Sequence, residues 1–264
     1  MEDLKLGKKS EDLKLLCEFL GVPVRSEFDS DLDTAVKSYQ KSRGLTIDGW
    51  VGYNTWKSLL LDYRKEKHNS KNIEEWDYTM FAKLLGIDPA ALKAVQKVET
   101  GGKGGFLANG KAQILFEGHV FWKELQALGI NPEKYGSAWS NVLYKSWDRS
   151  KYKGGNGEWD RLELAKKISP KAAYKSASWG MYQIMGNNYL KCGCKSVEEF
   201  VELMSKDSFS QFFLGVEFLK NTGIVKYLKT LDWASFARVY NGSGYKANQY
   251  DTKLEKAYKS YKTT

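Results

Sequence analysis

Apolar residues recur at helical spacing over most of this chain, and only one segment carries a strand-turn-strand signal. Residues at i, i+3 and i+4 mark the buried face of a helix. Between residues 9 and 63 we expect three short helices, the second of them capped by Ser30 or Asp31. Their marker positions are Leu13, Leu16, Leu20, Ala35, Val36, Tyr39, Leu59 and Leu60. The pattern predicts a mainly α fold.

The second half of the chain repeats this pattern. Asp88 and Pro89 predict a helix start, with the aspartate as cap and the proline at the first position. That helix must end by Gly101-Gly102. Asn109-Gly110 lies between apolar stretches at 106–107 and 112–116, which predicts a small β-hairpin. Further helices are expected over residues 119–128, 158–168, 196–204, 209–221, 233–240 and 250–261.

Residues 64–76, RKEKHNSKNIEEW, are charged and nearly free of apolar groups. Such a composition is typical of a linker. We therefore expect a small domain at 1–63, a linker at 64–76 and a larger domain at 77–264. A unit of the first domain's size is small but can fold alone.

The net charge of +9 is unevenly distributed. Residues 1–63 carry nine basic and eleven acidic side chains, which leaves 32 basic and 21 acidic ones, a balance of +11, on residues 64–264. A basic domain is attracted to polyanions. The partner could be nucleic acid, anionic lipid or an acidic wall polymer, and the charge alone does not choose among them. Because no recognisable nucleic-acid-binding motif accompanies the charge, we do not expect nucleic acid.

Cysteine and histidine usage gives little sign of a metal site. The three cysteines form a poor disulfide framework, which fits a reducing cytosol. Cys192 and Cys194 with one histidine leave a zinc site open as an alternative, but we favour a simple turn. No metal and no organic cofactor is therefore expected. The first residues lack a signal-peptide pattern, and no apolar run reaches the roughly 20 residues of a membrane span.

The segment 31–60, DLDTAVKSYQKSRGLTIDGWVGYNTWKSLL, contains the spacing T-A-V-x-x-Y-Q, then G-L-x-x-D-G-x-x-G-x-x-T-x-x-x-L. It resembles the peptidoglycan-binding domain found at the ends of many wall hydrolases. Asp48 and Thr55 are interpreted as structural, in a turn and near a helix start. Tyr39, Trp50 and Tyr53 are candidate wall-binding residues, because aromatic faces stack on sugar and peptide, although each is also a plausible core residue.

Glu99, in the segment 95–102 (VQKVETGG), is the candidate general acid. Cleavage of a glycosidic bond needs a donor that is still protonated near neutral pH. Glu99 lies at the predicted end of a helix, where the negative dipole end opposes ionisation. Burial beside the apolar stripe would raise its pKa further.

Three segments in order resemble the lysozyme superfamily, in particular goose-type lysozymes, lytic transglycosylases and phage muramidases. They are the ETGG stretch at Glu99, SWGMYQI at 178–184 and ARVYNG at 237–242. ILFEGHVF at 114–121 is similar to a phage N-acetylmuramidase signature. The resemblance implies a lysozyme-like α domain with a small β-hairpin. It also implies that Tyr182 and Gln183 line the sugar groove and that Tyr240 and Asn241 lie near the acid, although the 240–242 segment could simply end a helix.

A second carboxylate is less clearly defined. Glu117 alternates with Gln113 and Leu115 on one strand face, so it could act as base or stabiliser, or form a salt bridge. Carboxyl groups about 5–5.5 Å apart favour retention and about 6.5–9.5 Å inversion. His119 is interpreted as a packing or hydrogen-bonding neighbour.

The resemblance implies a peptidoglycan hydrolase that cleaves between N-acetylmuramic acid and N-acetylglucosamine, and we expect a monomer. The domain order without a signal peptide resembles a phage endolysin, made in the host cytoplasm and acting on the periplasmic wall once the inner membrane is permeabilised. The alternatives are a lytic transglycosylase that forms anhydro-muramic ends and, in another class, a non-catalytic wall-binding or virion structural protein. A basic C-terminal helix at 250–261 that disturbs membranes is an additional hypothesis.

Overall fold

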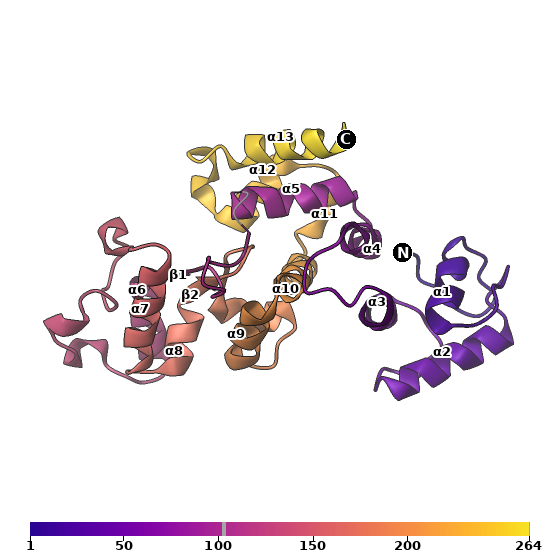
Figure 1. The fold of residues 1–264 in the computed structure, drawn as a ribbon, viewed down its shortest axis with the longest axis horizontal. Helices are drawn as coiled ribbons and strands as arrows, with labels where there is room; N and C mark the ends of the chain where they lie inside the picture. Colours follow the sequence, from indigo (N-terminus) through magenta and orange to yellow (C-terminus); the bar gives the residue numbers. More distant parts are fainter. Residues whose placement is uncertain (102–103, 264) are drawn as a thin grey trace. The chain divides into compact units, whose positions relative to one another are not determined.

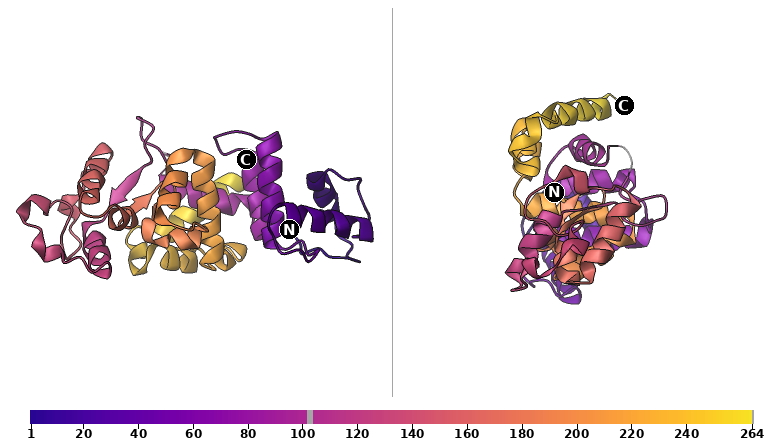
Figure 2. Two further views of the ribbon diagram at one scale, coloured as in Figure 1. Left: turned by 90° about the horizontal axis from the view of Figure 1, so that it is seen from below. Right: turned by 90° about the vertical axis from the view of Figure 1, so that its left-hand side faces the viewer.

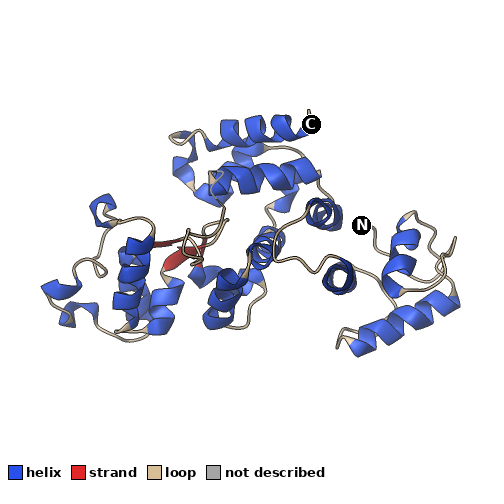
Figure 3. Cartoon of the chain, in the orientation of Figure 1, coloured by secondary structure: helices blue, strands red, loops and turns tan. Residues whose placement is uncertain are grey.

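A computed structural model describes residues 1–101 and 104–263 (Figure 1). The fold is mainly α, as predicted, with strands confined to one small sheet (Figure 3). The chain divides into two compact units, of which the first holds residues 1–70 and 74–89 and the second residues 71–73 and 90–264. In the described part of the chain, no helix is long and apolar enough to cross a membrane.

The first unit contains the three predicted helices and one more. They are α1 (Asp12–Leu20), α2 (Ser30–Ser42), α3 (Tyr53–Lys67) and α4 (Glu75–Leu85). The cap of α2 is one residue earlier than predicted, because Asp29 Oδ1 accepts a hydrogen bond from the Leu32 amide at 2.9 Å. The core is formed by Leu13, Leu16, Cys17, Phe28, Leu32, Val36, Trp56, Leu59 and Leu60, all buried.

The charged segment 64–76 has more structure than its composition indicates. Helix α3 continues to Lys67 and α4 begins at Glu75. Arg64 and Asp77 are both buried and form a two-pronged ion pair, with Nε–Oδ1 at 2.5 Å and Nη2–Oδ2 at 3.1 Å. Helix α4 therefore belongs to the first compact unit. Composition alone did not reveal that Arg64 has a buried partner in Asp77. The assignment of functions to residues 1–63 and 77–264 stays a prediction.

The second unit begins with α5 and ends with α13 (Figure 2). Its helices are α5 (Pro89–Thr100), α6 (Gly118–Ala127), α7 (Asn156–Lys166), α8 (Pro170–Lys175), α9 (Val197–Lys206), α10 (Ser208–Asn221), α11 (Val225–Lys229), α12 (Trp233–Asn241) and α13 (Tyr250–Lys262). Short 3-10 helices lie at η1 (Pro132–Lys134), η2 (Ser137–Trp139), η3 (Arg149–Lys151), η4 (Gly186–Cys192) and η5 (Ser243–Lys246). Every helix predicted from residue 88 onward is confirmed to within a few residues.

The sheet differs from the predicted hairpin. Its strands are β1 (Ile114–Phe116), β2 (Ala177–Trp179) and β3 (Ile184–Met185), in the antiparallel order β1-β2-β3. The Asn109-Gly110 turn forms, but it leads to only a single bridge between Phe106 and Ala112. Strand β1 pairs instead with β2, about sixty residues further on, because all three residues of β2 are buried and complete the core there. A local turn signal does not identify so distant a partner.

Candidate functional site

Glu99 lies in the last turn of α5, as predicted, and Gly102 of the same stretch lies outside the described residues. The helix is anchored by buried Ala91, Leu92 and Val95. The residue as a whole is half-buried, but its carboxyl group is closely surrounded by protein atoms. Burial raises the pKa of Glu99 to about 8, because a low-dielectric environment penalises the charged form. The carboxyl is therefore mostly protonated at neutral pH.

Tyr250 is the nearest polar partner of this carboxyl. Its hydroxyl donates a hydrogen bond to Glu99 Oε1. The bond stabilises the ionised form and lowers the pKa of Glu99, but by less than burial raises it. Tyr250 is the first residue of α13, and its hydroxyl also interacts with the side chain of Asn241. The predicted residue Asn241 thus reaches the acid through Tyr250.

Tyr240 lies close to the same group. Burial and then the neighbouring Glu99 raise the pKa of Tyr240 well above its usual value. Its hydroxyl donates a 2.9 Å hydrogen bond to the Tyr182 carbonyl, and its ring stacks on Phe236 at 5.4 Å between centroids. The structure therefore brings Glu99, Tyr240 and Asn241 together, in accord with the predicted neighbourhood.

Tyr182 and Gln183 have structural roles in this arrangement. The Tyr182 ring is buried, only 1% exposed, and packs so closely on Gly215 that a Cβ there would lie 2.4 Å from the ring. The buried ring is therefore not available to line a groove, and the backbone carbonyl of Tyr182 accepts the hydrogen bond from Tyr240. Gln183 has φ +46° and ties the β2–β3 turn, accepting from Ser178 Oγ at 2.9 Å and donating to the Gly180 carbonyl at 2.8 Å.

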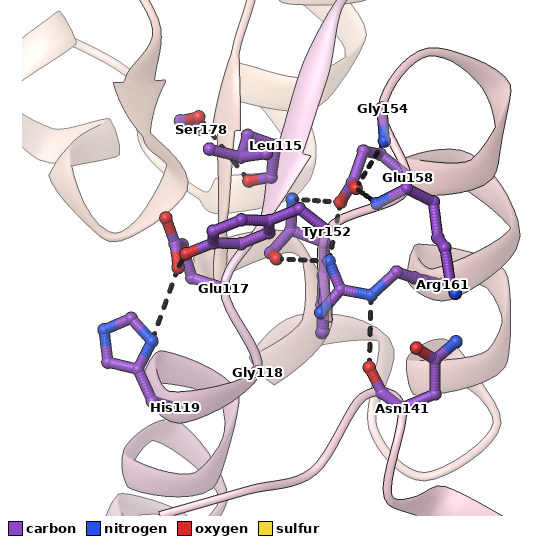
Figure 4. Close-up of polar contacts among 12 residues, drawn as sticks. Leu115, Glu117, Gly118, His119, Asn141, Tyr152, Gly154, Glu158, Arg161 and Ser178 are labelled. Carbon is purple, nitrogen blue, oxygen red and sulfur yellow. Dashed lines mark hydrogen bonds and ion pairs between the residues drawn. The ribbon is translucent and has the colours of Figure 1, made fainter. Parts of the chain in front are cut away.

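Glu117 stands at the end of β1 and immediately before α6 (Figure 4). Its Oε2 accepts a 2.5 Å hydrogen bond from the Tyr152 hydroxyl and lies 3.3 Å from Nδ1 of His119. Burial and the Glu117 carboxylate both raise the pKa of Tyr152, so the phenol keeps its proton. His119 is therefore a polar neighbour of Glu117, as interpreted from the sequence.

A buried ion pair between Glu158 and Arg161 lies beside the Glu117 segment (Figure 4). Arg161 Nη1 donates to Glu158 at 2.7 Å and to the Phe116 carbonyl at 2.8 Å, one residue before Glu117. Burial opposes ionisation of Glu158, but hydrogen bonds from the amides of Gly154, Lys153 and Phe116, together with Arg161, outweigh it and hold its pKa below the usual value. The orientation of the strand end is thus fixed by charge-assisted bonds.

Sequence reasoning missed Tyr250, Tyr152 and the Glu158–Arg161 pair. Tyr250 lies nine residues beyond Asn241, inside a helix noted only for its basic charge. The other three fall in segments without a recognisable motif. The basic helix α13 is itself part of the fold, since Leu254 and Ala257 are buried. A deletion of residues 246–264, which would test the membrane-disturbing hypothesis, would therefore also remove Tyr250 from the acid.

The three candidate wall-binding aromatics differ in exposure. Tyr39 is half-buried, and its hydroxyl is held by Asp62 at 2.6 Å and Ser58 at 2.7 Å. Tyr53 is half-buried at the start of α3. Trp50 keeps 52% of its surface exposed. Trp50 is therefore the aromatic most open to a ligand.

The described residues hold no group of three or more His, Cys, Asp and Glu side chains arranged for a metal ion. Cys192 and Cys194 flank Gly193, which has φ +79° and ends η4, as the favoured turn interpretation predicted. Both thiols are buried. Burial raises the pKa of Cys194 to about 12 and that of Cys192 further, which disfavours the thiolate that a metal would require.

Comparison with known families matches two parts of the chain. Residues 88–262 match the N-acetylmuramidase family, and residues 11–59 match the putative peptidoglycan binding domain. The solved structure of the Burkholderia AP3 phage endolysin is 30% identical, with 100% of each chain covered and a TM-score of 0.67. A comparison with curated proteins gave no match.

The match to the N-acetylmuramidase family, joined to a match to a peptidoglycan binding domain, identifies a lysozyme-type glycosidase that acts on peptidoglycan. The chain belongs to the N-acetylmuramidase family, whose model matches residues 88–262, well over half of the chain.

Proposed function

We propose that this enzyme hydrolyses the bond from N-acetylmuramic acid to N-acetylglucosamine, with Glu99 as the general acid. The observation that carries the proposal is the Glu99 carboxyl, whose pKa of about 8 keeps it protonated at neutral pH. General acids work best when their pKa lies near the operating pH. Glu99 would donate this proton to the leaving glycosidic oxygen.

Tyr250 and Tyr240 support this assignment through position. Because the Tyr250 hydroxyl donates to Oε1 of Glu99, the proton of the acid is directed to Oε2. Tyr240 remains neutral beside it, because burial and the nearby Glu99 keep its pKa high. The acid is thus held by side chains that do not compete for its proton.

Glu117 is the proposed base or charge stabiliser. It follows a strand of the sheet, its Oε2 is oriented by the hydrogen bond from Tyr152, and His119 lies beside it. The phenol of Tyr152 stabilises a negatively charged carboxylate, which is the state needed to activate water or to stabilise an oxocarbenium ion. Gln183 and Asn241 are proposed to adjoin the bound sugar, whereas Tyr182 contributes only its backbone.

The module at residues 11–59 is proposed to hold the enzyme on peptidoglycan, through Trp50 in particular. The likeness to the AP3 phage endolysin supports an endolysin role here. That role comprises synthesis in the host cytoplasm, followed by action on the periplasmic wall. The excess positive charge of residues 64–264 would assist adsorption to anionic wall or outer-membrane surfaces. We propose a monomer without a nucleic-acid partner.

Mass spectrometry of glycan fragments tests the reaction directly. Purified peptidoglycan is digested with wild type and with Glu99→Gln, reduced with borohydride and analysed. The expected result is reducible N-acetylmuramic acid ends from wild type and a loss of about 10²–10⁴-fold in rate for the variant. Anhydro-muramic ends would identify a lytic transglycosylase, and no cleavage by either protein would support a non-catalytic wall-binding protein.

A further inference from the structure

The first unit contains a pocket of about 440 Å³, of which the binding-domain motif accounts for only one side. Its lining residues are Asp3, Lys5, Lys8, Asp48 and Trp50. The volume is within the usual range for small-molecule sites. Asp3, Lys5 and Lys8 precede the residues that match the binding-domain family, so one side of the pocket comes from outside the recognised domain.

The first side of the pocket is the N-terminal segment, which hydrogen bonds attach to the rest of the module. Leu4 and Val51 exchange two backbone hydrogen bonds, of 3.2 and 2.8 Å. The indole of Trp56 donates to the Glu2 carbonyl at 2.8 Å, and the Gly7 amide donates to the Phe28 carbonyl at the same distance. Asp3, Lys5 and Lys8 are therefore carried on an ordered segment of backbone.

The second side of the pocket is the turn at residues 48–50, which is hydrogen-bonded to the side chain of buried Gln40. Gln40 Oε1 accepts from the amides of Asp48 and Gly49 at 3.1 and 3.0 Å, and its Nε2 donates to the Trp50 carbonyl at 3.0 Å. Gly49 has φ +71°, and a Cβ there would lie 2.1 Å from Asp33 Oδ1. The turn is thus rigid before a ligand arrives, which reduces the entropy lost on binding.

The charges of the pocket have both signs. Among the described residues, Asp3 and Lys5 take part in no ion pair, and Lys8 has an exposed one with Glu2 at 3.6 Å. A neutral glycan would stack on Trp50 but would leave these charges without counterparts. A ligand with both carboxylates and an amine would complement them, and complementary charge is what gives a binding site its specificity.

We propose that this pocket binds the stem peptide of peptidoglycan, a short peptide that carries carboxylates and a free amine. Lys5 and Lys8 face its carboxylates, and Asp3 and Asp48 face its amine. The exposed indole of Trp50 covers the aliphatic part of its side chains. This inference rests on the proposed function, because it takes peptidoglycan as the partner of the module.

Calorimetric titration of the full chain with a synthetic stem tetrapeptide, containing a diamino acid with a free amine, tests the proposal. We expect Trp50→Ala to weaken binding at least about tenfold, as is common for a central aromatic residue. Lys5→Met, Asp3→Asn and acetylation of the peptide amine should each weaken it several-fold. Val24→Ala and Lys14→Met, at exposed positions outside the pocket, are the matched controls and should bind as wild type does.

The same titration with chitotetraose distinguishes a peptide site from a glycan site. Binding of chitotetraose that Trp50→Ala abolishes, with no binding of the tetrapeptide, would overturn the proposal. Tetrapeptide binding that Trp50→Ala and Lys5→Met leave unchanged would do so as well. Circular dichroism and thermal unfolding show whether each variant is folded, and Trp50→Phe, which keeps an aromatic face, should retain part of the affinity.

A separate assay keeps this inference distinct from the proposed function. Release of reducing ends by wild type is measured on glycan chains free of stem peptides. Tetrapeptide binding without release of reducing ends would uphold the pocket and refute the proposed hydrolysis. Release of reducing ends without tetrapeptide binding would uphold the hydrolysis and refute the pocket.

Discussion

The hydroxyl of Tyr250 donates a hydrogen bond to the carboxyl of Glu99 across 151 residues of sequence. The bond joins the end of α5 to the start of α13. It acts on the acid in two ways, because it fixes the orientation of one carboxyl oxygen and opposes the rise in pKa that burial causes. The C-terminal helix is thereby connected to the proposed catalytic group.

Tyr250→Phe should shift the alkaline limb of activity to higher pH. Loss of the hydrogen bond removes the influence that lowers the pKa of Glu99, so the carboxyl stays protonated further into the alkaline range. Activity at neutral pH should nevertheless fall about tenfold, because the carboxyl proton of Glu99 is then no longer directed to Oε2. The measurement is kcat/KM against pH, with Tyr261→Phe on the same helix as control. An unchanged profile in Tyr250→Phe would show that the bond has no part in catalysis.

Glu99→Gln should stabilise the fold at alkaline pH and not at acid pH. The folded pKa of Glu99, about 8, lies above its ordinary value of 4.5, so the folded state holds a proton that the unfolded state has lost. Stability from this group is complete below the unfolded pKa and is lost as pH rises through 8. Urea unfolding at pH 5 and pH 9 should show a gain for the variant on the order of 2 kcal/mol only at pH 9. An equal difference at both pH values would contradict the assigned pKa.

Tyr152→Phe should lower kcat about tenfold with little change in KM. The variant removes the 2.5 Å hydrogen bond to Glu117 but keeps the ring, so the carboxylate loses orientation while the surrounding packing remains. Steady-state rates on soluble glycan are the measurement. Tyr135→Phe, at a half-buried position in the same unit, is the control, and a matching loss in both variants would argue against a role for Glu117.

Binding to intact walls should weaken as salt rises above about 0.15 M, because the Debye length there is about 8 Å and falls further. Residues 64–264 carry the positive excess, and sedimentation of Glu99→Gln with walls at increasing salt measures its effect without cleavage of the wall. Cleavage of a short neutral glycan by wild type over the same range is the control. Adsorption that does not respond to salt would exclude a contribution from the basic surface.

The sequence predicted most of the helices and the position of Glu99 at a helix end, because these depend on spacing and capping within one segment. Helices α4, α8 and α11 were not predicted, and the place of Tyr240 and Asn241 near the acid was implied by the family resemblance. The sequence also did not predict the partner of β1. The Asn109-Gly110 turn forms with a single bridge, but strand β1 pairs with the buried strand β2. Pairing between distant segments depends on which surfaces fill the core, and a short stretch of sequence does not contain that information.

The sequence by itself determined that the chain is mainly helical, that a wall-binding motif precedes an acid at a helix end, and that its later part is basic. The helices, the position of the acid and the basic charge follow from periodicity, capping and composition, and the wall-binding motif follows from the resemblance to a known domain. Only the tertiary structure decided that Tyr250 donates to Glu99, that the Tyr182 ring is buried, and that the charged residue Arg64 is buried with Asp77. Such facts depend on contacts between residues far apart in the chain, where burial and hydrogen bonding set the pKa and the exposure of each side chain.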